Sequence, residues 1–125
     1  ELPVPGILES PFGFFESKIF SYKKQKIEEK KYTKWFDYDK IKNSPCVRTR
    51  RQGDYLTVNS EGGRKKLNRI FIDEKIPAEM RDRFPVVAVG SEILWIPGGR
   101  MNEKYKITST TGRVLELHYQ GGALA

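Results

Sequence analysis

Two pairs of adjacent glycines, each followed by an arginine, form the patterns in this chain that come nearest to a phosphate site. They are Gly62-Gly63-Arg64 and Gly98-Gly99-Arg100. Backbone N–H groups of glycine-rich loops bind phosphate oxygens, above all where the loop leads into a helix. Neither pair has the length or flanking residues of a nucleotide-binding loop. We therefore expect ordinary turns, although Gly62-Gly63 could hold one phosphate of an RNA backbone and Arg100 is a candidate phosphate ligand.

Residues suited to acid–base or nucleophilic catalysis are few and scattered. His118 has no Ser or Cys nucleophile with an orienting acid near it in the sequence, and it faces outward on a predicted strand. Asp37 and Asp39 lie two apart and would face the same way, as an acid pair or a metal site requires. Their basic neighbours Lys34 and Lys40 favour structural charges instead.

The single cysteine, Cys46, can form no internal disulfide and has only His118 as a possible companion for zinc. We interpret it as a small apolar residue at the start of a strand, in a reducing compartment. The sequence thus predicts no catalytic residue, no metal site and no cofactor for this chain.

Two tryptophans are candidates for stacking on nucleobases, because every base presents a π-face. Trp95 lies inside an apolar segment and is expected in the core. Trp35 stands near Tyr32 and Phe36, and both a stacking role and a packing role stay open for it.

The chain is basic, with 23 Lys and Arg against 16 Asp and Glu in 125 residues and a net charge of +7. This balance favours a polyanionic partner, because each basic group that meets a phosphate releases condensed counterions. Charge alone does not choose among tRNA, rRNA, DNA and anionic lipid, and a basic surface without an anionic partner is the alternative. No apolar run reaches the roughly 18 residues of a membrane span and no signal peptide is apparent, so we expect a soluble, cytoplasmic protein with no membrane partner.

Alternating and apolar segments predict a mainly antiparallel β framework. Strands are expected at residues 14–22, 46–51, 55–58, 85–89, 92–96, 105–108 and 114–119. A tight turn at Gly90-Ser91 would join two of them. The lysine-rich residues 23–34 are interpreted as a solvated linker or, alternatively, as an arm that contacts RNA.

Two short helices are expected between Arg64 and Phe84, which makes the fold class α+β. In the first, Leu67, Ile70 and Phe71 recur at helical spacing, and a helical wheel places Lys65 and Arg69 opposite them. The second would begin at Pro77 and end before Pro85.

Three motifs in this region follow the pattern of a known family. They are Arg50-Arg51-Gln52-Gly53-Asp54 with Gly63-Arg64-Lys65-Lys66-Leu67, Asp73-Glu74-Lys75-Ile76-Pro77 with Arg81-Asp82 and Pro85, and Ile93-Leu94-Trp95 with Gly98 and Arg100. With them, roughly residues 35–119 resemble the C-terminal domain of bacterial tRNA(Ile)-lysidine synthases.

The resemblance implies a parent enzyme that uses ATP with magnesium to adenylate the wobble cytidine of the CAU-anticodon isoleucine tRNA and then attaches lysine, forming lysidine. That chemistry belongs to an N-terminal domain with a Ser-Gly-Gly-x-Asp-Ser phosphate loop, a motif that this chain lacks. The family's C-terminal domain is similar in fold to a domain of the phenylalanyl-tRNA synthetase β subunit and engages the acceptor-stem side of the tRNA. We thus expect residues 1–34 to be the tail of a preceding connecting region with a basic linker, residues 35–120 the tRNA-binding domain, and residues 121–125 a disordered tail.

A non-catalytic RNA-binding face is therefore expected. Its predicted residues are Arg48, Arg50, Lys65, Lys66, Arg69 and Arg100, with Lys75, Lys104 and Lys106 as weaker candidates. Cations suit a duplex stem, which is read mostly through phosphates and 2′-hydroxyls. Expected partners are isoleucine tRNA, the N-terminal catalytic domain of the same chain and, in a homodimer, a second copy. The alternatives are a sequence-blind RNA- or ribosome-binding module and an intramolecular docking or dimerisation domain.

Overall fold

The computed structural model describes residues 1–27 and 30–121, and the chain divides into two compact units. The first unit combines Glu1–Ser44 with Tyr105–Ala125, and the second is the continuous segment Pro45–Lys104. No helix among the described residues is long and apolar enough to cross a membrane.

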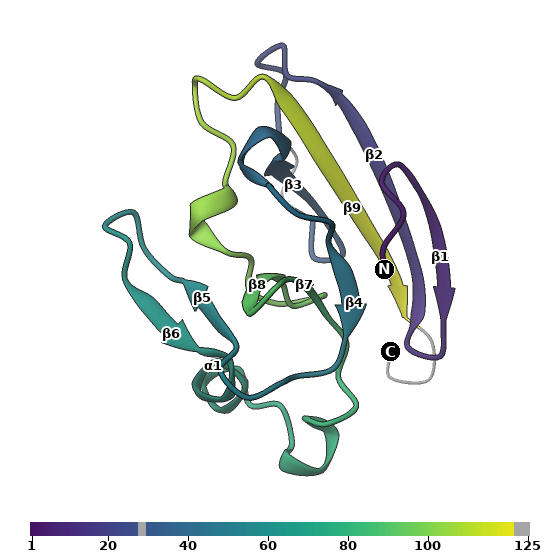
Figure 1. Cartoon of the computed structure of the whole chain (residues 1–125), viewed down its shortest axis with the longest axis vertical. Coiled ribbons are helices and arrows are strands. Elements are labelled where there is room, and N and C mark those ends of the chain that lie inside the picture. Colours follow the sequence, from purple (N-terminus) through teal and green to yellow (C-terminus); the bar gives the residue numbers. More distant parts are fainter. Residues whose placement is uncertain (28–29, 122–125) are drawn as a thin grey trace. The chain divides into compact units, whose positions relative to one another are not determined.

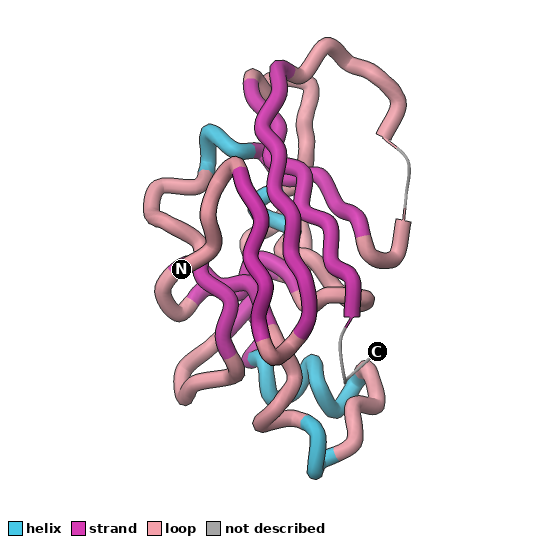
Figure 2. Tube along the Cα trace, turned by 90° about the vertical axis from the view of Figure 1, so that its right-hand side faces the viewer, coloured by secondary structure: helices cyan, strands magenta, loops and turns pink. Residues whose placement is uncertain are grey.

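The first unit contains a four-stranded antiparallel sheet with the order β1-β2-β9-β3. Its strands are β1 (Gly6–Ser10), β2 (Gly13–Ser21), β3 (Thr33–Asp37) and β9 (Arg113–Gly121), and a 3-10 turn η1 (Tyr38–Lys40) follows β3. The long strands β2 and β9 run side by side, with β3 along the other edge of β9 (Figure 1; Figure 2). The last strand of the chain therefore lies in the middle of the sheet.

Side-chain alternation divides this first sheet into a buried and a partly exposed face. Phe15, Phe36, Leu115 and Leu117 have no exposed surface. On the other face of β9, Glu116 and His118 stay partly exposed, whereas Val114 near the start of the strand is buried. The predicted alternation of residues 14–22 and 114–119 is thus confirmed.

The second unit contains a five-stranded sheet with the order β4-β7-β8-β5-β6, in which only the pairing of β5 with β8 is parallel. Its strands are β4 (Cys46–Arg48), β5 (Tyr55–Thr57), β6 (Arg64–Lys66), β7 (Val86–Val89) and β8 (Glu92–Trp95). The helix α1 (Leu67–Asp73) follows β6 directly, and a 3-10 turn η2 (Ala78–Met80) comes later. Every residue of β7 is buried, and β7 lies between β4 and β8 in the sheet.

The core of the second unit joins α1 to its sheet. Leu67, Ile70 and Phe71 of α1 are buried against Leu56, Val86 and other apolar strand residues, and Cys46 packs at the edge of this cluster. Trp95 is fully buried. The predicted apolar face of the helix, the core position of Trp95 and the place of Cys46 at the start of a strand are confirmed.

Within residues 1–27 and 30–121, one α-helix is present where two were expected, so the fold is mainly β. Residues 64–66 form a strand paired with β5, and the helix begins only at Leu67, whose N–H donates to the carbonyl of Asp54. The second predicted helix is a single 3-10 turn, and turn residues 81–83 follow it before Pro85.

Two further expectations differ from the structure. Residues 105–108 form no strand; a 3-10 turn η3 (Glu103–Tyr105) comes first, and a turn at residues 109–110 follows, where the N–H of Thr108 donates to the Thr111 hydroxyl. The predicted division at residue 34 does not coincide with the two units, because β9 pairs with β2 and with β3. Within the expected tail, Gly121 belongs to β9, and residues 122–125 lie outside the described part of the chain.

Candidate nucleic-acid interface

Arg48 lies inside the second unit and closes a turn. Its Nη1 and Nη2 atoms donate to the two carboxylate oxygens of Asp54, each at 2.8 Å, and Nη2 also donates to the carbonyl of Gly90. Asp54 further accepts the N–H of Arg51 at 2.7 Å, and Gly53 has the positive φ of 92° that the turn requires. The hydrogen bonds that Arg48 donates to Asp54 raise the pKa of Arg48.

The prediction that Arg48 belongs to an RNA-binding face therefore needs correction. Only 9% of Arg48 is exposed. The predicted strand was too long, since β4 ends at Arg48 and the chain then turns toward Asp54. Because Arg50 lies beyond the end of β4, the alternation of side chains along a strand does not place Arg48 and Arg50 on the same face of the sheet.

Arg50 remains at the surface but is held by two neighbours. Its Nε atom donates to Asp82 at 2.7 Å, and Nη1 donates to the amide oxygen of Asn68 at 3.0 Å. Asp82 is largely exposed, so this pair contributes little to stability. Arg50 links α1 with the segment that follows η2.

Lys65, Arg69 and Arg100 lie around one carboxylate, that of Asp73 at the end of α1. Lys65 on β6 and Arg69 on α1 form ion pairs with Asp73 at 2.5 and 3.3 Å. The hydrogen bond from Lys65 lowers the pKa of Asp73, and the charges of Lys65, Arg69 and Arg100 act in the same direction. We call these four residues the Asp73 cluster; its three cations exceed its one carboxylate.

Arg100 belongs to this region through its backbone and its side chain. Its N–H donates to Glu74 at 3.1 Å, and its Nη2 atom donates to the carbonyl of Val58 at 3.1 Å. Arg100 remains exposed. The structure thus brings Lys65, Arg69 and Arg100 together, although Lys65 stands on a strand and not on the predicted helix.

Arg64 and Lys66 lie on the edge strand β6, beside Tyr55 of β5. Tyr55 pairs with Lys66 across the ladder, and the guanidinium of Arg64 lies 4.5 Å from the centre of the Tyr55 ring. Both cations are exposed, and neither forms an ion pair within residues 1–27 and 30–121. We call these three residues the Tyr55 face. Arg64 was not among the predicted site residues; the period-two spacing of Arg64 and Lys66 beside an aromatic residue could have indicated it.

The glycine pairs are turns. Between β5 and β6, the side-chain oxygen of Asn59 accepts the N–H groups of Glu61 and Gly63, so these donors are already used. At the other pair, the N–H of Gly99 donates to the carbonyl of Ile96 at 2.7 Å. Neither loop holds a set of converging N–H groups for phosphate.

The weaker candidates Lys75, Lys104 and Lys106 belong to neither the Asp73 cluster nor the Tyr55 face. Lys75 is exposed just after α1. Lys104 lies 3.6 Å from Glu92, and Lys106 belongs to the first unit. Asp37 and Asp39, the possible acid pair, have separate structural roles: Asp37 accepts from Thr111, and Asp39 pairs with Arg113, whose hydrogen bond lowers the pKa of Asp39.

The sequence of the second unit and of β9 matches a known family. Residues 46–117 match the protein family described as TilS substrate C-terminal domain. The chain belongs to this family. Over 97% of this TilS C-terminal domain and 94% of the matching chain, the fold agrees with a solved structure described as "Crystal structure of TILS C-terminal domain", with a TM-score of 0.80 and 34% sequence identity.

Relatives of this TilS C-terminal domain carry the name tRNA(Ile)-lysidine synthase. The protein of Caldanaerobacter subterraneus subsp. tengcongensis is 41% identical over 120 residues, covering 94% of this chain and 26% of the relative. The protein of Geobacillus kaustophilus is 37% identical over 123 residues, covering 96% of this chain and 26% of the relative. The chain therefore spans about a quarter of the length of these two relatives.

Proposed function

We propose that this domain binds tRNA and contributes substrate recognition, without chemistry of its own, to a tRNA(Ile)-lysidine synthase. The observation that carries the proposal is the Tyr55 face, where two exposed cations flank an aromatic ring on the edge of a rigid sheet. The Asp73 cluster adds further cations on the adjoining β6 and α1. The family to which the chain belongs is described as the TilS substrate C-terminal domain, and this membership supports a role in binding the substrate.

The arrangement suits the backbone of an RNA duplex. Residues i and i+2 of a strand lie roughly 6.6 Å apart, so Arg64 and Lys66 can contact separate phosphates. Arg offers a planar fork of donors for a phosphate, whereas Lys offers a compact charge. Phosphate contacts of this kind position a protein on RNA but carry little sequence information. We therefore assign this surface to a stem of the tRNA and propose the acceptor-stem side.

The proposed role implies a division of labour within a longer enzyme. ATP and magnesium would be used by an N-terminal catalytic domain that adenylates the wobble cytidine of isoleucine tRNA and attaches lysine. The present domain would hold the same tRNA at a distance from that reaction, in the cytoplasm. Similarity in fold to a domain of the phenylalanyl-tRNA synthetase β subunit is part of this proposal.

Titration of the purified chain with isoleucine tRNA at several salt concentrations tests the proposal. We expect about four to six phosphate contacts. The logarithm of the binding constant should therefore fall against the logarithm of the salt concentration with a slope of roughly −3 to −5. A tRNA with a different acceptor stem serves as the competitor. Salt-independent association, or no association, would favour a docking or dimerisation domain, and equal affinity for both tRNAs would favour a sequence-blind RNA-binding module.

A further inference from the structure

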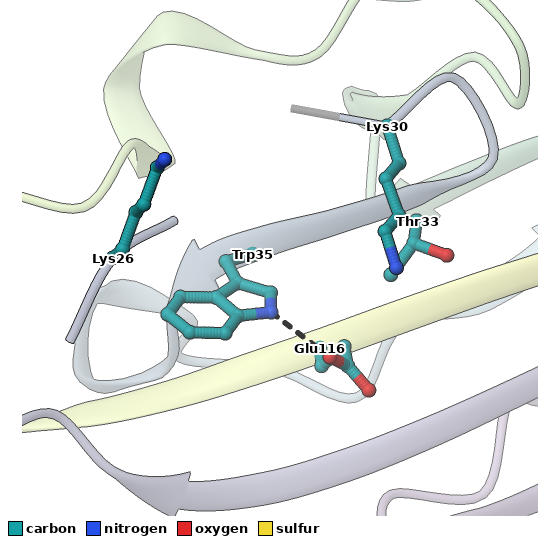
Figure 3. A pocket seen from close by; sticks show the side chains of 5 residues that line it. All are labelled: Lys26, Lys30, Thr33, Trp35 and Glu116. Atoms are coloured by element: carbon teal, nitrogen blue, oxygen red, sulfur yellow. Dashed lines mark hydrogen bonds between the residues drawn. The ribbon is translucent and has the colours of Figure 1, made fainter. Parts of the chain in front are cut away.

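A second candidate site lies in the first unit, on the partly exposed face of its sheet. A cavity of about 210 Å³ is lined by Lys26, Lys30, Thr33, Trp35 and Glu116. Figure 3 shows Trp35 at the centre of these residues, with Glu116 beside the indole nitrogen and the two lysines coming from the segment before β3. None of these residues belongs to the Tyr55 face or the Asp73 cluster.

Strand pairing holds the floor of this cavity in place. Trp35 of β3 is directly opposite Glu116 of β9, and Thr33 is opposite His118. The indole Nε1 donates to Glu116 Oε1 at 2.9 Å, and the Thr33 hydroxyl lies 2.7 Å from His118 Nδ1. Such cross-strand contacts fix the side chains before any ligand arrives.

Trp35 differs from the other tryptophan of the chain in its surroundings. Trp95 is fully buried, whereas Trp35 is only partly buried and borders the cavity. Phe20 packs edge-on against Trp35, with ring centres 4.9 Å apart and planes at 74°, and so supports the indole. A fixed, partly exposed indole beside lysines is the arrangement by which proteins stack single-stranded bases.

The size and the polar groups of the cavity limit the ligand. Sites for drug-sized molecules measure roughly 300–1,000 Å³, so this smaller cavity suits a single ring. Glu116 bonds Trp35 through one oxygen and has a second oxygen that can accept a hydrogen bond. Carboxylates accept from the exocyclic amino group of cytosine, and adenine carries a similar group, whereas uracil presents a carbonyl oxygen there.

We propose that this cavity binds one unpaired cytosine or adenine of the RNA, stacked on Trp35, with its amino group donating to Glu116 and its phosphate near Lys26 and Lys30. The inference rests on the proposed function, since it assigns a single-stranded part of the bound RNA to a second place on the domain. It adds base readout to the phosphate contacts of the Tyr55 face.

The test uses short single-stranded RNAs of cytidine, adenosine or uridine and the intrinsic tryptophan fluorescence of the chain. Because Trp95 is buried, quenching reports on Trp35. We expect saturable quenching by oligocytidine and oligoadenosine, and affinity at least about tenfold lower for oligouridine. Equal quenching by all three, or none, would overturn the inference.

The variant Glu116→Gln provides the discriminating comparison. Its amide oxygen can still accept from Trp35, while its NH₂ group would donate to the base, so the preference should move toward oligouridine by about tenfold or more. A merely structural contact between Trp35 and Glu116 predicts no change in base preference, and thermal unfolding checks that the variant is folded.

Failure of this inference can be told apart from failure of the proposed function. Salt-dependent tRNA binding without base-dependent quenching would overturn the cavity assignment and leave the tRNA-binding role standing. Base-dependent quenching by oligocytidine without any binding of tRNA would support the cavity and contradict the role of the Tyr55 face.

Discussion

At the scale of single residues, burial decides whether an arginine in this domain supports the fold or remains available to a ligand. Arg48 and Asp54 are both nearly inaccessible and share two hydrogen bonds. Arg64 lies on the surface and stacks on Tyr55. Arg48 and Arg64 are both arginines in one short stretch of sequence, so residue type alone does not show which of them is buried. The separation comes from the turn at Gly53, which returns Asp54 to Arg48.

Replacing Arg48 by Met should destabilise the domain strongly. The substitution leaves the Asp54 carboxylate buried without its main partner, and breaking such a pair from one side costs about 3–5 kcal/mol. The control is Arg50→Met, which removes a pair with the largely exposed Asp82 and should cost no more than about 1 kcal/mol. Chemical denaturation measures both; a loss for Arg48→Met no larger than for the control would contradict the structural role of Arg48.

At the scale of elements, the junction of β6 and α1 explains where the sequence reading failed. A helical wheel starting at residue 64 places Lys65 and Arg69 on one side, and the two do meet, but through Asp73 and from a strand and a helix. Three residues are too few for periodicity to distinguish strand from helix. The pairing of β6 with β5 depends on a turn organised by Asn59, which the local pattern does not reveal.

The link between these elements can be observed through the ionisation of Asp73. Lys65→Met should raise the pKa of Asp73 toward its ordinary value, because the hydrogen bond from Lys65 is the largest cause of the lowering. Arg69→Met should raise it less, since Arg69 contributes a smaller, coulombic effect. Carboxyl chemical shifts followed by NMR during an acid titration give both values.

The sign of the accompanying stability change follows from the lowered pKa. The contribution of Asp73 is present above the ordinary pKa of an aspartate and is lost as the pH falls through the lowered, folded-state value. Lys65→Met should therefore reduce the dependence of unfolding on pH in this acidic window. An unchanged pKa of Asp73 in the Lys65 variant would show that the strand and the helix are not joined by this pair.

At the scale of the whole molecule, the sequence predicted local elements better than it predicted their partners. The alternation of residues 114–119 identified β9, and the apolar segments around Gly90-Ser91 identified the hairpin of β7 and β8. Periodicity carries no information about which distant strand pairs with which. The position of β9 between β2 and β3, and the parallel pairing of β5 with β8, therefore appear only in the structure.

The sequence also predicted some residues of the candidate interface better than others. Lys65, Lys66, Arg69 and Arg100 are at or near the surface of one unit, as the charge pattern and the family motifs suggested. The burial of Arg48 could not be foreseen, because its partner lies across a turn. Glu116 was missed as a cavity residue because it reaches Trp35 from β9, far along the chain, while Lys26 and Lys30 were interpreted only as part of the lysine-rich residues 23–34.

The central claim is that tRNA binds to the Tyr55 face, and one titration tests it most directly. The affinity of the double variant Arg64→Glu/Lys66→Glu for isoleucine tRNA is compared with that of the parent chain and of Arg51→Glu/Arg83→Glu. The control carries the same change of net charge at two other exposed arginines of the second unit. Thermal unfolding confirms that the three proteins are folded.

We expect the Arg64/Lys66 variant to bind at least about tenfold more weakly, a loss of roughly 1.4 kcal/mol. The slope of the logarithm of its affinity against the logarithm of the salt concentration should also be flatter by about one to two, as expected when two phosphate contacts are lost. The control should lose no more than about threefold, through the weaker long-range field alone. Equal losses of affinity in both variants would show that binding depends on net charge alone. If the folded Arg64/Lys66 variant binds tRNA as tightly as the parent chain, the assignment of the Tyr55 face to tRNA is contradicted.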